Sequence, residues 1–156
     1  MIKVDMSSPD IDRQIEFLKY YPEVFKKHFR PMLYRNVNRG KALVAAGVPR
    51  RTGKAAAALK ASVRGTGVKM EGHFGWSGND TPWYINVVEY GATPHPIDPR
   101  KPGGWLKIGN SYVRHVEHPG FAARKFMAAA YASLKPTIDA EILTANEAVL
   151  NEMVVR

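Results

Sequence analysis

Three histidines are the first side chains of this sequence that could do chemistry. His95, His115 and His118 could together hold a metal ion, because neutral imidazole is a common metal ligand. His115 and His118 lie three residues apart, which would put them on opposite faces of a strand, and no pair of carboxylates converges on them by spacing. We therefore interpret all three as turn and rim histidines that hydrogen-bond the backbone, and we expect neither a metal nor a cofactor.

Glu89 is a second candidate, since it lies in an otherwise apolar segment just before Tyr90 and Gly91. A carboxylate there could act as a general base. It could equally pair with a Lys or Arg, or anchor the turn that follows. No second acid or nucleophile is near it in the sequence, and there is no Cys, Gly-rich phosphate loop or nucleophile elbow. We favour a structural role and predict that the protein is not an enzyme.

A basic turn follows Pro49. Arg50, Arg51 and Lys54 surround Thr52-Gly53 and could bind a phosphate at the start of a short helix. The Thr-Gly-Lys order resembles the end of a phosphate-binding loop, but the upstream Gly is misplaced and no strand precedes it, so we reject that motif.

Positive charge is concentrated in the first half of the chain. The net charge is +9, and residues 24–70 contain twelve Lys or Arg and no Asp or Glu. This asymmetry indicates an acidic partner, either nucleic acid, an acidic protein surface or another subunit, although a solvated basic face is the alternative. Trp76, Trp83 and Trp105 could stack on bases, but their apolar contexts favour core packing or subunit contacts.

The elements that must position these residues begin with helices. At 156 residues, with 45% hydrophobic residues, the chain has the size and composition of a single domain over 1–156. Residues 1–9 form a loose lead-in, and helical spacing of apolar residues predicts a helix over 10–20 and a second from Pro22 to about residue 46. Pro31 should kink the second helix.

The second half mixes short strands and helices. Residues 61–64 and 68–76 predict a hairpin, 84–89 fit either a helix or a strand, and 92–104 are a Pro-rich mobile loop. A second hairpin is predicted from 105–108 and 112–116. A helix opening at Phe121 should run to about Leu134, and Pro136 should start another that reaches the end. The fold class is α+β, with a small antiparallel sheet packed against a long N-terminal helix and C-terminal helices.

Apolar runs and cysteine content also indicate where in the cell the protein is found. There is no apolar run near the ~20 residues of a membrane helix and no signal-peptide core, and the absence of Cys suits a reducing compartment. We expect a cytoplasmic product that does not contact a membrane.

Several short motifs follow one another within residues 22–135: Val48 to Lys54, Tyr84, Val88 to Ala92, Ile97 to Pro99, Leu106, Val116 to Gly120, Phe126-Met127 and Ala130. Taken in order, they resemble the tail-component family of long-tailed bacteriophages. That family has a Pro-x-x-Thr-Gly turn, a Tyr followed by Val-Glu-aromatic-Gly-Thr, and a Val-x-His-Pro-Gly turn before Pro-Phe-(Leu/Met)-x-x-Ala. Ala92 replaces the commoner Thr, and Lys125 replaces the Pro that usually precedes Phe.

The resemblance implies a non-catalytic virion protein at the head–tail junction, a tail-completion or neck component. Such proteins form rings, often of six subunits, around the DNA channel, with tail-tube or connector proteins as partners. The isolated chain should be a monomer or weak oligomer, assembled in the host cytoplasm, with non-specific contact to channel DNA. Candidate interface residues are Arg50, Arg51, Lys54, Trp83, Tyr84, Glu89, Tyr90, Trp105 and His118. The alternatives are a nucleic-acid-binding module that uses residues 24–70 and a hydrolase that uses Glu89 and His118.

Overall fold

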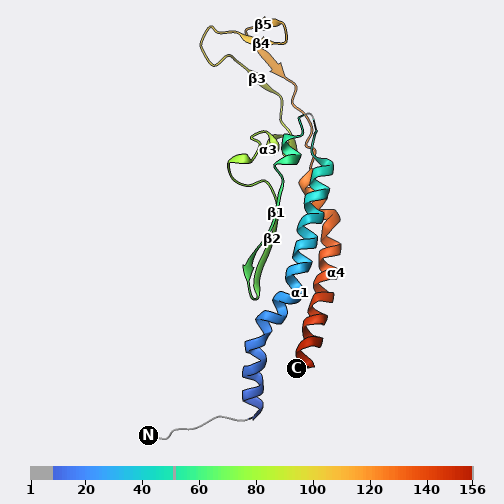
Figure 1. Ribbon diagram of the computed structural model, residues 1–156. Coiled ribbons are helices and arrows are strands. Elements are labelled where there is room, and N and C mark those ends of the chain that lie inside the picture. The colour runs from blue at the N-terminus through green and yellow to red at the C-terminus, as the bar shows by residue number, and fades with distance from the viewer. Residues whose placement is uncertain (1–8, 51, 156) are drawn as a thin grey trace, which may run out of the picture.

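The protein is an elongated helical hairpin with a β arm projecting from one end (Figure 1). The computed structural model describes residues 9–50 and 52–155. Its helices are α1 (Pro9–Gly47), α2 (Lys54–Ala57), α3 (Ile85–Tyr90) and α4 (Phe126–Val154), with a 3₁₀ turn at Gly78–Asp80. The strands are β1 (Lys60–Thr66), β2 (Lys69–Gly75), β3 (His95–Ile97), β4 (Leu106–Ile108), β5 (Ser111–Val113) and β6 (Val116–His118).

Both long helices run through prolines that were predicted to interrupt them. Pro22 and Pro31 lie inside α1, and Pro136 lies inside α4. The predicted breaks at Pro22 and Pro136 were therefore wrong. Figure 1 shows α1 bending rather than ending in its N-terminal part, because a proline removes one backbone hydrogen bond while the turns on either side stay helical.

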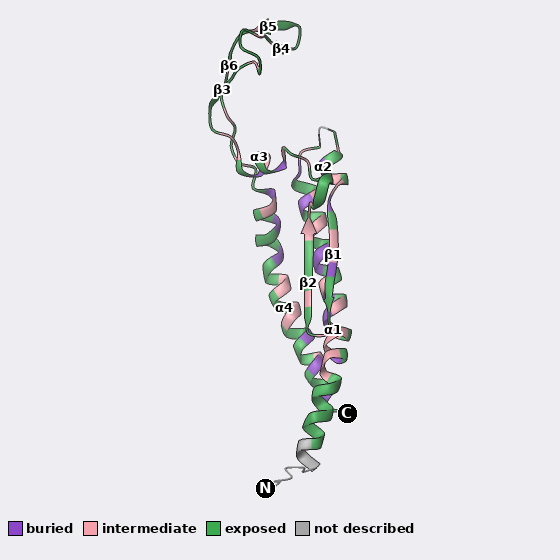
Figure 2. Cartoon of the chain, turned by 90° about the vertical axis from the view of Figure 1, so that its left-hand side faces the viewer, coloured by how far each residue is buried: buried purple, intermediate pink, exposed green. Residues whose placement is uncertain are grey.

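The two long helices pack antiparallel, with their buried faces toward each other (Figure 2). One core cluster lies near the free end of the hairpin, where Val24, Phe29 and Met32 of α1 meet Val149 and Met153 of α4. A second lies near the arm and contains Val44, Val48, Ala55, Leu59, Ile85, Phe126 and Ala130. The spacing of apolar residues along α1 predicted which face of the helix is buried. The helical hairpin is long, and its buried residues form one cluster toward each end rather than a single core.

The β1–β2 hairpin lies along α1 at very short range. A Cβ at Gly40 of α1 would come within 2.8 Å of the Phe74 ring, and one at Gly72 of β2 would come within 2.7 Å of Val37. Glycine at both positions thus lets the hairpin approach the helix closely. The hairpin was predicted, and its register runs from Lys60 opposite Gly75 to Thr66 opposite Lys69.

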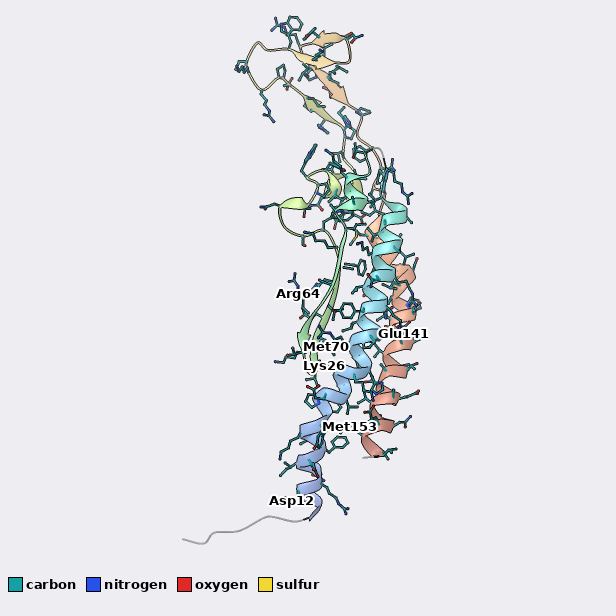
Figure 3. The ribbon with its side chains drawn as sticks, in the orientation of Figure 1. Asp12, Lys26, Arg64, Met70, Glu141 and Met153 are labelled. Carbon is teal, nitrogen blue, oxygen red and sulfur yellow. The ribbon has the colours of Figure 1, made fainter. Side chains whose placement is uncertain are left out.

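Polar contacts join the helices between the two core clusters. Glu141 of α4 accepts hydrogen bonds from Arg39 Nη1 at 3.0 Å, from the buried Asn36 Nδ2 at 2.9 Å and from Arg35 Nη2 at 3.5 Å. Figure 3 shows Glu141 beside α1 in the middle of the hairpin. Burial raises the pKa of Glu141, but the hydrogen bonds from Arg39 and Asn36 outweigh it, so that the pKa is lower than its usual value.

Replacing Glu141 with glutamine should lower the free energy of unfolding at pH 7 by about 1–2 kcal/mol, because the charge-assisted bonds are lost. The folded-state pKa is depressed, so this stabilisation is present above the usual value of 4.5 and disappears as the pH falls through the folded-state value. Urea unfolding at pH 7 and at acid pH measures the difference. Glu147→Gln, an exposed position on the same helix, is the control, and equal effects of both variants would contradict the prediction.

The Pro-rich stretch 92–104 belongs to a two-part β arm, and it contains the short strand His95–Ile97 within an otherwise irregular path. Residues His95–Ile97 pair with Val116–His118, and beyond them Leu106–Ile108 pair with Ser111–Val113. At the base of the arm Ala92 and Phe121 exchange backbone hydrogen bonds of 3.0 and 2.9 Å. Phe121 therefore belongs to the arm, and the prediction that a helix opens there was wrong: α4 begins at Phe126.

The predicted fold class is confirmed: the protein is α+β, with a small antiparallel β1–β2 sheet packed against a long N-terminal helix, which also packs against a C-terminal helix. Within the described residues the strands form three separate two-stranded pairs. The ambiguous segment 84–89 is helical, since α3 spans Ile85–Tyr90.

Candidate interaction surfaces

Glu89 joins α3 to the start of α4. Its carboxylate is buried and accepts hydrogen bonds from the backbone N–H of Met127 at 3.0 Å and of Ala128 at 3.2 Å. The Glu89 carbonyl also accepts a bond from the Lys125 N–H. A carboxylate at a helix N-terminus satisfies free N–H groups and interacts favourably with the helix dipole. Glu89 thus caps α4, and its side chain is not on the surface where an interface residue was expected.

An apolar groove lies where the arm leaves the helical body. Its volume is about 570 Å³, and its lining comes from three separated segments: Pro49, Thr52, Tyr84, Val88, Phe121, Ala122 and Arg124. Most of the wall is apolar, with the hydroxyls of Thr52 and Tyr84 and the guanidinium of Arg124 as its polar side-chain groups. Such a surface suits an apolar side chain better than a charged ligand.

Residues from two of the motifs on which the resemblance to the phage tail-component family rests, far apart in the sequence, lie together in the groove. Pro49 and Thr52 come from the Pro-x-x-Thr turn, and Tyr84 and Val88 from the Tyr…Val-Glu segment. Lys125, which stands where the family has Pro, has a φ of +50°. Proline cannot adopt that angle, so a proline at position 125 would require another backbone conformation just before α4.

Two large aromatic side chains project from the α3 region. Trp83 is 85% exposed and Tyr90 is 79% exposed, while Tyr84 is half-buried and lies edge-on to the Trp83 ring at 5.8 Å. Exposed aromatic side chains are enriched at protein–protein contact sites. Trp83 lies in the turn before α3, exposed rather than packed in the core.

The predicted basic face is divided and partly paired. Lys27 forms an ion pair with Glu152 of α4 at 2.8 Å, and Arg35 and Arg39 pair with Glu141. Some of the basic residues of the first half, which were expected to bind an acidic partner, therefore pair with carboxylates of the chain's own helix α4. Arg64, on β1, points away from α1 (Figure 3), and Arg50 and Lys54 are exposed near the groove. Arg51 lies outside the described residues.

The arm histidines separate into two groups. His95 and His118 stack across the β3–β6 pair with ring centres 4.9 Å apart, and His118 Nδ1 accepts a bond from the Gly120 N–H. His115 instead bonds Asp98 at 2.8 Å and Glu117 at 2.7 Å, and these carboxylates, Asp98 foremost, raise its pKa. Among the described residues no group of three or more His, Asp or Glu side chains could hold a metal ion.

A second groove of about 710 Å³ opens at the opposite end of the molecule. It lies between the N-terminal part of α1 and the end of α4 and is lined by Arg13, Glu16, Phe17, Tyr20, Met153 and Val154. Ile15 and Leu18 nearby are 44% and 67% exposed. Sequence analysis gave this end of α1 an apolar stripe but did not single it out as a surface.

The candidate residues thus fall into three places. Tyr84 lines the junction groove and Trp83 and Tyr90 lie on the same short helical region, whereas His118 is in the lower arm and Trp105 is at the arm tip (Figure 1). Phe121 and Arg124 were not predicted as groove residues, because the segment after Gly120 was assigned to a helix. The position of Trp105 in the arm tip could be predicted, because residues 105–108 begin the second predicted hairpin.

Comparisons with known proteins add no assignment. A scan of the chain against family models matched none, and searches of curated proteins and of solved structures gave no significant match. Within the described residues, no helix is both long enough and apolar enough to cross a membrane.

Proposed function

We propose that this protein is a bacteriophage virion structural protein at the head–tail junction, a tail-completion or neck component that acts by assembling and docking without catalysis. The ordered motifs are the sequence basis of the proposal. The single observation that supports it best is the junction groove, because the groove collects the motif residues Pro49, Thr52, Tyr84 and Val88 around one apolar surface.

The shape of the molecule supports docking through unlike surfaces. The junction groove with Trp83 and Tyr90 lies near the arm, and the groove lined by Phe17 and Tyr20 lies at the other end of the helical hairpin. A ring of identical subunits needs head-to-tail contacts between two different patches. The apolar junction groove and the mixed polar and apolar groove at the other end are two unlike surfaces on one chain that would meet that requirement. Neighbouring tube or connector proteins would be further partners.

The proposal is tested by producing phage particles without this chain. We expect unjoined heads and tails in electron micrographs and no infectious particles. The purified chain should be a monomer or weak oligomer by light scattering. Normal, infectious virions in the absence of the chain would overturn the proposal.

Complementation can then test the exposed aromatic surface of the α3 region. A Trp83→Ala/Tyr90→Ala variant removes two exposed side chains and should fold normally yet fail to restore joining. The matched control is Tyr131→Ala/Leu143→Ala, which removes side chains that are 57% and 65% exposed on α4. The control should restore infectivity; restoration by both variants would show that the α3 surface is not needed.

A further inference from the structure

The outer hairpin of the arm has one face made of alternating aromatic and cationic side chains. Lys107 lies directly opposite Tyr112 in the β4–β5 register. Two positions further along, beyond the Leu106–Val113 pair, the Arg114 guanidinium lies 4.0 Å from the centre of the Trp105 ring. Because side chains two apart on a strand share a face, Trp105, Lys107, Tyr112 and Arg114 all lie on one side of the ribbon.

These four side chains are available to a partner. Trp105 is 56% and Tyr112 is 63% exposed, and Lys107 and Arg114 are exposed as well. Arg114 is held in place, since its Nη1 donates to the Gly103 carbonyl at 2.6 Å in addition to stacking on Trp105. The cation–aromatic pair is therefore organised before any ligand arrives.

The positive charge of the arm tip is not balanced by any carboxylate within the tip. Residues 99–114 contain Arg100, Lys101, Lys107 and Arg114 and no Asp or Glu. The acidic residues that flank the tip, Asp98 and Glu117, both bond to His115. This contrasts with α1, where Lys27, Arg35 and Arg39 already have carboxylate partners on α4.

We propose that this ribbon face is a nucleic-acid-binding surface that recognises the phosphate backbone and the faces of bases without sequence preference. Cations would contact phosphates, and exposed rings would stack on bases or lie along the groove wall. A two-stranded ribbon also has the width that the DNA major groove admits. The one-to-one alternation of cations with aromatic rings favours nucleic acid, because phosphates and base faces alternate along a strand and match the two kinds of side chain. The inference rests on the arm and not on the proposed joining role.

The test measures anisotropy of a labelled 20-base-pair duplex and of one of its strands, with the full chain at several salt concentrations. Lys107→Gln/Arg114→Gln should weaken binding about tenfold at low salt and reduce the salt slope by about 1.8 for the duplex, since each lost phosphate contact removes about 0.9. Tyr112→Ala should weaken single-strand binding about fivefold or more. Binding of either form that responds in this way supports the proposal.

The matched control is Lys54→Gln/Lys69→Gln, which removes the same charge from exposed positions outside the arm. It should retain nearly full affinity. The proposal is overturned if neither nucleic acid binds, if the control weakens binding as much as the arm variant, or if polyglutamate displaces the DNA as effectively as unlabelled DNA does. Loss of particle joining with retained DNA binding would count against the proposed function only.

Discussion

Glu89→Ala should lower the free energy of unfolding by about 3 kcal/mol. The variant removes the two carboxylate acceptors of the Met127 and Ala128 N–H groups, which are 3.0 and 3.2 Å away, and leaves these partly buried donors at the start of α4 without a partner. Each such donor costs about 1–3 kcal/mol, and the favourable interaction with the helix dipole is lost as well. Urea unfolding at neutral pH, followed by circular dichroism, measures the change.

Two further variants separate capping from other roles of a glutamate. Glu89→Gln keeps one acceptor oxygen and should cost less than the alanine variant. Glu147→Ala removes an exposed glutamate from the same helix and should change stability by less than about 0.5 kcal/mol. An unchanged unfolding midpoint for Glu89→Ala would show that the carboxylate does not hold α3 and α4 together.

Phe126→Ala should have a still larger effect, about 3–5 kcal/mol. Phe126 is the first residue of α4 and is only 4% exposed within the core cluster near the arm. Its ring lies edge-to-face with Trp76 at 5.9 Å, and Trp76 in turn donates a hydrogen bond from Nε1 to the Ala55 carbonyl at 2.7 Å. The truncation would leave a cavity among α1, α2, α3 and α4 that these elements cannot all close.

The size of that cavity can be varied in a matched series. Phe126→Leu preserves much of the volume and should cost about 1.5 kcal/mol. Tyr131→Ala removes an aromatic ring that is 57% exposed on α4, so it should be nearly neutral. Thermal and urea unfolding of the three variants provide the comparison, and a loss for Tyr131→Ala equal to that for Phe126→Ala would contradict the assignment of this core.

Most of the local elements could be predicted from residue types and their spacing. The spacing of apolar residues predicted the buried face of α1, because a helix returns to the same side every three or four residues. Turn residues predicted the β1–β2 and β4–β5 hairpins, and an isolated glutamate in an apolar segment pointed to a structural role for Glu89. The helix boundaries predicted at Pro22 and Pro136 were wrong, because both prolines lie inside continuous helices. The free energy lost with one backbone hydrogen bond is small compared with the free energy gained when the flanking turns pack on the opposite helix.

The contacts between residues that are far apart in the chain could not be predicted and are seen only in the folded structure. Glu89 reaches α4 across 38 positions of the chain, Glu141 and Glu152 neutralise part of the basic first half, and β3 pairs with β6 so that the Pro-rich stretch becomes an arm. The junction groove likewise needs Pro49, Tyr84 and Phe121 together. Local periodicity records which side of an element is apolar, but not which other element covers it, because that choice depends on the packing of the whole chain.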